Sequence, residues 1–150
     1  MPVAAVQALG TGKPISLTAF AHPGMMRAVA DVRARRPIGA TYIFSGQMAQ
    51  YRGDEPTIMD MVDVDSVKFA SLAKSAKPGM RSVLKREGRL LGRYERQVAQ
   101  SVAATLFVSE AEAALFRSGG GRGMSLRSRT GSTPAIMTPP LSTPGRPTAR

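Results

Sequence analysis

Hydrophobic residues gather in three short runs, separated by longer segments in which hydrophobic and polar positions alternate at helical spacing. The runs are ATYIF at 40–44, TIMDMV at 57–62 and ATLFV at 104–108. Short runs rich in β-branched, aromatic and other apolar residues are typical of buried strands. Strands separated by helices favour a parallel sheet. The pattern therefore predicts an α/β fold with a three-stranded parallel sheet and flanking helices.

Helical patterns occupy most of the remaining chain. They predict helices over 24–35, 66–75, 80–100 and 109–116, and the end of a further helix over 1–9. We expect Ile15–Leu17 to be extended. Ser66 is the expected N-cap of the 66–75 helix, because a serine hydroxyl accepts from the free backbone N–H groups of a first turn.

Two of these helices have a clear apolar face. The 66–75 helix should turn Val67, Ala70 and Ala73 inward. The 80–100 helix carries an apolar stripe formed by Met80, Val83, Leu84, Leu91, Tyr94 and Val98. Gly88 and Gly92 interrupt this long helix, and each should weaken it by roughly 1 kcal/mol relative to alanine.

Polar residues follow each predicted strand. In an open α/β sheet, ligands bind at the carboxyl ends of the strands. The candidate catalytic residues are Asp63 and Asp65, which could orient or deprotonate a hydroxyl group. The alternative is that they are solvated carboxylates near a helix start. The candidate residues facing a ligand cleft are Ser45, Gly46, Gln47, Ser109 and Glu110. Asp60 lies within a strand, where burial is costly without a partner such as an arginine of the long helix.

Composition limits the chemistry. The 150 residues suffice for one domain, and the absence of Cys together with a single His, His22, leaves no pattern for a metal site or cofactor. The net charge of +11 is compatible with nucleic acid or an anionic membrane surface. All acidic residues lie at or before Glu112, however, so part of the excess belongs to the C-terminal segment. Neither a transmembrane segment nor a signal peptide is evident, so we expect a cytoplasmic chain, with peripheral membrane contact through the basic face at 85–96.

Three segments resemble one known family: FSGQMAQY, MDMVDVDSVKFASLA and LKREGRLLGRYERQVAQSVAATLFVSEAEAALFR. They are similar to the sugar transferases associated with PEP-CTERM/exosortase systems, which are nucleotide-sugar glycosyltransferases with two Rossmann-like domains, the GT-B fold. The resemblance covers residues 12–117. It implies that residues 1–117 are part of the N-terminal, acceptor-side domain. Its opening strand should precede Met1, and the donor domain should follow Arg117.

The resemblance stops at Arg117, where the composition becomes rich in Gly, Ser, Pro and Arg. Codons for MSLRSRTGSTPAIMTP can be chosen so that translation of the same DNA in the reading frame one base earlier yields VAPVENGVDSGYYDP. NGVD, followed by an aromatic pair and a proline, resembles the start of the family's second domain. We therefore expect 118–150 to be a disordered basic tail translated out of frame.

These observations predict a fragment of a glycosyltransferase of exopolysaccharide biosynthesis, inactive alone. The resemblance implies a nucleotide-sugar donor, bound only with the missing domain, and a saccharide or lipid-linked acceptor. The alternative is a non-enzymatic basic protein that binds nucleic acid or an anionic membrane. A third hypothesis is a half-domain that pairs with a separate chain carrying the donor domain.

Overall fold

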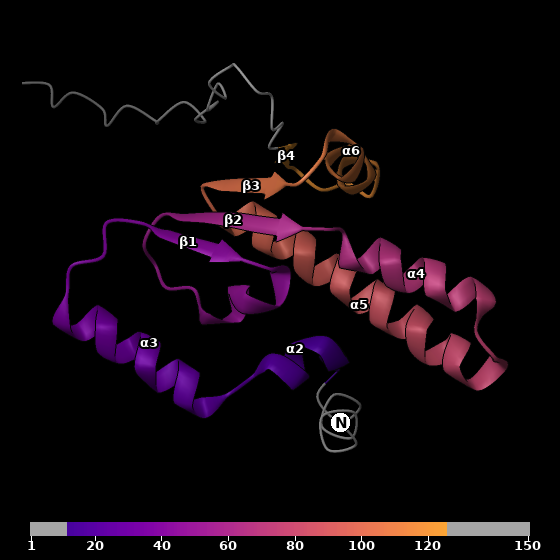
Figure 1. The fold of residues 1–150 in the computed structure, drawn as a ribbon, viewed down its shortest axis with the longest axis horizontal. Coiled ribbons are helices and arrows are strands. Elements are labelled where there is room, and N and C mark those ends of the chain that lie inside the picture. Colours follow the sequence, from indigo (N-terminus) through magenta and orange to yellow (C-terminus); the bar gives the residue numbers. More distant parts are fainter. Residues whose placement is uncertain (1–11, 126–150) are drawn as a thin grey trace, which may run out of the picture.

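The protein is an α/β structure built on a parallel sheet (Figure 1). A computed structural model describes residues 12–125. The predicted helix at 1–9 and the tail beyond Ser125 lie outside the described residues. The strands are β1 (Thr41–Phe44), β2 (Thr57–Val62), β3 (Ala104–Phe107) and β4 (Met124–Ser125). The helices are α2 (Ile15–Phe20), α3 (Pro23–Arg35), α4 (Asp65–Ser75), α5 (Pro78–Ser101) and α6 (Glu110–Ser118), with a 3-10 turn, η1 (Gly46–Tyr51).

The three predicted strands are confirmed, and they pair in parallel in the order β1-β2-β3. The two-residue strand β4 adds to the outer edge of β3, also in parallel. Residues 118–125 therefore differ from the expected disordered tail. Ser118 completes α6, and a glycine-rich turn leads the chain back to β3.

The hydrophobic core lies on one face of this sheet. It joins strand residues Ile43, Met59, Met61 and Phe107 to Val98 of α5 and Phe116 of α6. The rings of Phe107 and Phe116 lie 5.0 Å apart between centroids. In Figure 1, α5 runs behind the sheet, which agrees with the burial of its C-terminal half.

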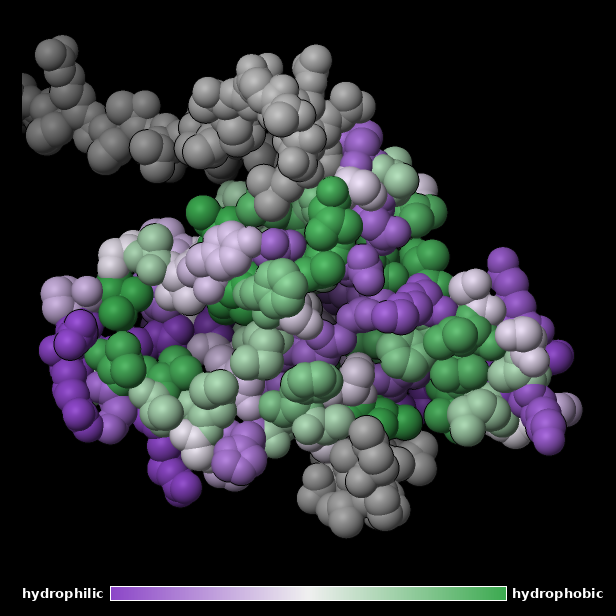
Figure 2. Space-filling view, in the orientation of Figure 1, coloured by the Kyte–Doolittle hydropathy of each residue, from purple (hydrophilic) through white to green (hydrophobic). Residues whose placement is uncertain are grey.

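The opposite face of the sheet is not covered by any described element. Alternation along β1 places Tyr42 and Phe44 on this face, and they are 57% and 62% exposed. Their neighbours in register on β2 are Ile58 and Asp60. Figure 2 shows hydrophobic residues over much of this side of the molecule. The expectation that 40–44 is a buried strand is therefore wrong, because only Ile43 is buried.

The free edge of β1 is also without a partner strand among residues 12–125. The N–H groups of Thr41 and Ser45 point to β2, where they bond Pro56 O and Asp60 O. In a parallel strand the backbone N–H and C=O groups of alternate residues point to opposite sides. The N–H and C=O groups of Tyr42 and Phe44 thus face outward, on the side where α3 lies.

Residues 15–17 are helical, which corrects the expected extended conformation. The carboxylate of Glu87 on α5 accepts from the backbone N–H groups of Ile15 and Ser16, both at 2.8 Å. These bonds satisfy donors that a helix start leaves free. The capping group comes from more than 70 residues away, so local sequence contains no sign of it.

Ser66 is not the N-cap of α4, because that helix starts one residue earlier, after Val64. The backbone N–H and the hydroxyl group of Ser66 instead donate to Glu95 of α5, at 2.9 and 2.5 Å. Val67 and Ala70 are exposed, and only Ala73 of the predicted inward face is buried. The contact between α4 and α5 therefore includes polar groups and backbone as well as the buried Ala73.

Gly88 and Gly92 have a role that helix propensity does not show. A Cβ atom on Gly88 would lie 2.9 Å from the carbonyl oxygen of Ser66, and one on Gly92 would lie 3.3 Å from the Ser66 Cβ. The two glycines therefore allow α4 to approach α5 closely. Met80 and Val83, at the other end of the predicted stripe, remain exposed.

Candidate site at the carboxyl edge of the sheet

The candidate residues follow strands β1, β2 and β3, and parallel pairing places the ends of these strands at one edge of the sheet. Ser45 follows β1, Asp63 follows β2, and Ser109 lies just beyond β3. These residues therefore gather at the carboxyl edge of the sheet.

Three of the predicted residues form one hydrogen-bonded chain. The hydroxyl of Ser45 donates to the side-chain oxygen of Gln47. The amide nitrogen of Gln47 in turn donates to Asp65 Oδ2 at 2.5 Å. Asp65 is therefore held across the gap between the β1 and β2 ends, in the first turn of α4. The hydrogen bond from Gln47 therefore fixes the position of the Asp65 carboxylate and occupies one of its two oxygens.

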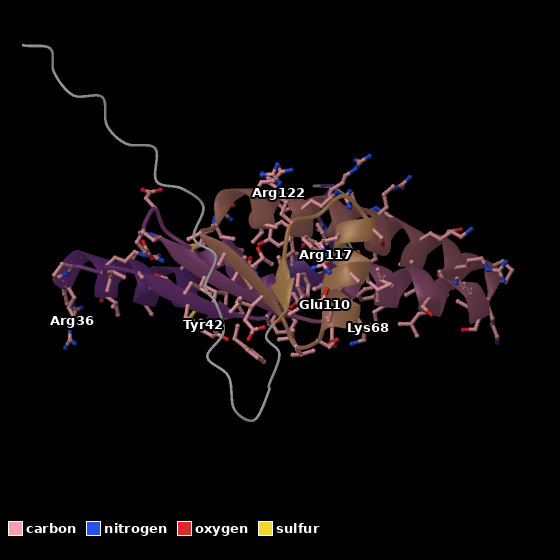
Figure 3. The ribbon with its side chains drawn as sticks, turned by 90° about the horizontal axis from the view of Figure 1, so that it is seen from above. Arg36, Tyr42, Lys68, Glu110, Arg117 and Arg122 are labelled. Carbon is pink, nitrogen blue, oxygen red and sulfur yellow. The ribbon has the colours of Figure 1, made fainter. Side chains whose placement is uncertain are left out.

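Asp63 is different, because its exposed side chain has no hydrogen-bond or ion-pair partner among the described residues. It lines a hollow of about 280 Å³ together with Val64, Val67, Lys68 and Glu112. This carboxylate is free to accept from a ligand hydroxyl in that hollow. Lys68, labelled in Figure 3, provides a positive charge on the same wall.

Glu112 belongs to the site although the strand-end argument did not select it. Its Oε2 atom accepts from the backbone N–H of Val64 at 2.8 Å and so ties α6 to the loop after β2. The spacing Ser109-x-x-Glu112 is that of a capping box, and Ser109 does accept from the Glu112 N–H at 3.2 Å. The capping-box spacing places Glu112 at a helix start, whereas its hydrogen bond with Val64 depends on tertiary structure.

Glu110 and Gly46 lie at the edge of the site without joining the hydrogen-bonded chain. Glu110 forms an ion pair with Arg117, on its own helix, and the two side chains lie close together in Figure 3. A Cβ atom on Gly46 would lie 3.3 Å from the sulfur of Met61, so this position favours a residue without a side chain. Both predictions of cleft-facing roles thus remain predictions.

Two residues at the strand ends adopt left-handed backbone conformations. Ser45 has φ of 73° and Val62 has φ of 66°. A positive φ is unfavourable for a β-branched residue, and such strain clusters at functional sites. Val62 lies at an irregularity in the pairing of β2 with β3. Its N–H is held by Asp60 Oδ1 at 3.0 Å, which helps to fix the turn that presents Asp63.

Asp60 is buried within β2, as its position indicated, but its partner is not an arginine. Its Oδ2 atom accepts from the Tyr42 hydroxyl at 2.5 Å. This hydrogen bond to a carboxylate raises the pKa of Tyr42. Both carboxylate oxygens of Asp60 accept hydrogen bonds from protein groups, so this residue stabilises the end of β2.

Within residues 12–125, His, Cys, Asp and Glu side chains form no group of three or more that could hold a metal ion. The same part of the chain contains no helix with the length and hydrophobicity needed to span a membrane.

A search for similar proteins found no match among protein families, curated proteins or solved structures.

Proposed function

We propose that this chain is the acceptor-side part of a nucleotide-sugar glycosyltransferase of the GT-B type, acting in exopolysaccharide biosynthesis. The observation that carries the proposal is the polar site at the carboxyl edge of the parallel sheet. There Asp63 is free while Asp65 is held by Gln47. Ligands of open α/β sheets bind at this edge. The sequence resemblance supplies the reaction class.

In this proposal the two carboxylates have different roles. Asp63 accepts a hydrogen bond from the acceptor hydroxyl and assists its deprotonation as the hydroxyl attacks the sugar. Asp65, already bonded to Gln47, positions the loop that carries Asp63. The donor diphosphate belongs to a second domain, which closes the cleft and places donor and acceptor together.

The incomplete sheet supports a partial domain. Both the outer edge of β1 and the face bearing Tyr42 and Phe44 lack a covering element among the described residues. Parallel sheets in α/β proteins are normally covered on both faces. A preceding strand of the same domain would pair with β1, and further elements would cover the exposed face. The acceptor is then a saccharide or a lipid-linked saccharide, reached at the cytoplasmic membrane surface.

Titration of the isotopically labelled chain with acceptor oligosaccharides, followed by amide NMR, tests the site. We expect shifts at residues 45–47 and 62–65 that disappear in Asp63→Asn. The matched control is Asp54→Asn, which removes the same charge from an exposed loop position. Shifts that persist in Asp63→Asn, or no shifts at all, would contradict the assigned site.

An assay of sugar transfer tests whether the chain acts only as the acceptor side of the enzyme. The purified chain should transfer no sugar from a nucleotide-sugar donor, because in this proposal residues 12–125 supply only the acceptor side of the cleft. Joining the chain in frame to the coding sequence that follows Arg117 should restore transfer. Measurable transfer by the chain alone would refute this part of the proposal.

A further inference from the structure

A groove of about 570 Å³ lies between α4 and α5, on the outside of the pair. Its floor is formed where Gly88 and Gly92 meet the first turns of α4. Its walls carry five basic side chains and no acidic one: Lys74, Lys85, Arg89, Arg93 and Arg96. Val67 lines both this groove and the hollow beside Asp63, so the two lie on either side of the start of α4.

None of the five cations of this groove forms an ion pair among the described residues. Among the described residues, the ion pairs involve Arg33, Arg35 and Arg117, none of which lines the groove. The two acids of α5, Glu87 and Glu95, are buried and accept hydrogen bonds from the starts of α2 and α4. Arg96 donates to the carbonyl oxygen of Gly119 at 3.3 Å, which uses a donor without neutralising the charge.

Spacing along α5 aligns these cations. Lys85, Arg89, Arg93 and Arg96 recur at intervals of four, four and three residues, which places them along one side of a helix. Lys74 faces them from α4 across the groove. Like charges placed this close repel one another, so an anion between them lowers the electrostatic free energy.

We propose that this groove binds a phosphate or diphosphate group. Arginine guanidinium groups match phosphate oxygens with two parallel N–H donors, and lysine adds a mobile charge. The walls contain no aromatic side chain, whereas binding of single-stranded nucleic acid usually stacks bases on aromatic rings. The chemistry therefore fits a phosphorylated small molecule or a lipid phosphate headgroup. This inference does not depend on the proposed transferase function.

Titration of the full chain with inorganic pyrophosphate, measured by calorimetry at low and high salt, tests the groove. We expect saturable binding that weakens as salt rises. Arg89→Glu should weaken binding by about tenfold or more, and Arg89→Gln by less. The matched control is Arg36→Glu, an equal change of charge at the far end of the molecule (Figure 3). Thermal unfolding of each variant verifies that it is folded.

A second arm distinguishes the two sources of phosphate. Vesicles of phosphatidylglycerol are compared with vesicles of phosphatidylcholine by co-sedimentation. Binding to the acidic vesicles alone, weakened by Arg89→Glu and competed by pyrophosphate, supports a lipid headgroup. Binding of pyrophosphate without vesicle binding supports a soluble ligand.

Three results would overturn the proposal. The first is the absence of binding in both arms. The second is equal weakening by Arg89→Glu and Arg36→Glu, which would indicate attraction by net charge alone. The third is tighter binding of a single-stranded oligonucleotide than of pyrophosphate with the same dependence on Arg89, which would indicate a nucleic-acid surface.

Discussion

Glu55 and Glu95 lie in surroundings that act on their carboxyl groups in opposite directions. A hydrogen bond from Arg33 and another from Thr41 stabilise the charged form of Glu55 and lower its pKa to about 2. Burial against α4 instead raises the pKa of Glu95. The two residues should therefore give opposite pH dependence of stability.

For Glu55, the lowered pKa means that its contribution to stability is present above the unfolded value of 4.5. This contribution is lost as pH falls toward 2. We expect the free energy of unfolding to fall over that range in the wild-type chain, and to fall less steeply in Glu55→Gln. Denaturant unfolding at a series of pH values measures the difference. Equal slopes would contradict the Arg33–Glu55 contact.

For Glu95, the raised pKa reverses the direction in which stability changes with pH. Stability from the protonated carboxyl is fully present below pH 4.5 and is lost as pH rises through the folded-state pKa. Glu95→Gln, which cannot ionise, should remove this loss while retaining an acceptor for Ser66. The same unfolding series on Glu95→Gln provides the test, and the prediction fails if the wild-type and variant curves stay parallel above pH 4.5.

At the residue scale, the sequence predicted polar side chains at the strand ends but not the partners of those side chains. Asp63, Asp65, Ser45 and Gln47 were predicted because polar residues followed apolar runs. The engagement of Asp65 by Gln47 depends on the register of β1 against β2. The positive φ of Val62 was also unpredictable, because nothing in a Met-Val-Asp sequence favours a left-handed backbone.

The pairing of α4 with α5 depends on the absence of side chains at two positions of α5. Gly88→Ala would place a methyl group 2.9 Å from a backbone oxygen of α4, and backbone cannot move aside as a flexible side chain can. We expect a loss of about 1–3 kcal/mol in the free energy of unfolding. The matched control is Gly79→Ala, whose Cβ meets nothing within 4 Å. It should be neutral or stabilise by up to about 1 kcal/mol.

Chemical denaturation of both variants measures these effects. If Gly88→Ala were as stable as Gly79→Ala, the two helices would not be as closely paired as the structure shows.

At the element scale, periodicity located strands β1 to β3 and helices α3 to α6 to within a few residues, but it missed the two-residue strand β4. It failed for α2, because six residues carry too little periodicity and the stabilising Glu87 lies on α5. It also misjudged which faces are buried. Val67 and Ala70 were expected to face inward, and Met80 and Val83 to belong to the apolar stripe of the long helix, but all four are exposed. The start of α5 lies beside α4 and extends beyond the sheet.

Within residues 12–125, the sheet has one covered and one uncovered face. Tyr42 and Phe44 are exposed on the uncovered face, next to the free edge of β1. Free edges and exposed apolar faces promote association between chains. The arrangement of the sheet could be predicted from alternating strands and helices, but the bare face could not, because strand composition alone suggests burial on both sides.

We expect the chain to associate as its concentration rises, and Phe44→Lys to reduce this association. Phe20→Lys provides the matched control, because Phe20 is an exposed aromatic residue on α2, at 56% against 62% for Phe44. Sedimentation velocity over a range of concentrations measures both variants. Equal association of the two would show that the sheet face is not the contact surface.

Glu87 and Glu95 attach two separate parts of the molecule to one side of α5, since one holds the start of α2 and the other the start of α4. They lie eight positions apart along α5, or about 12 Å and slightly more than two turns of helix. One residue inserted between them would turn Glu95 by about 100° relative to Glu87. Natural variation should therefore keep this spacing even where the outer face of α5 changes freely. Insertions and deletions in relatives should fall in the loops at either end of this helix.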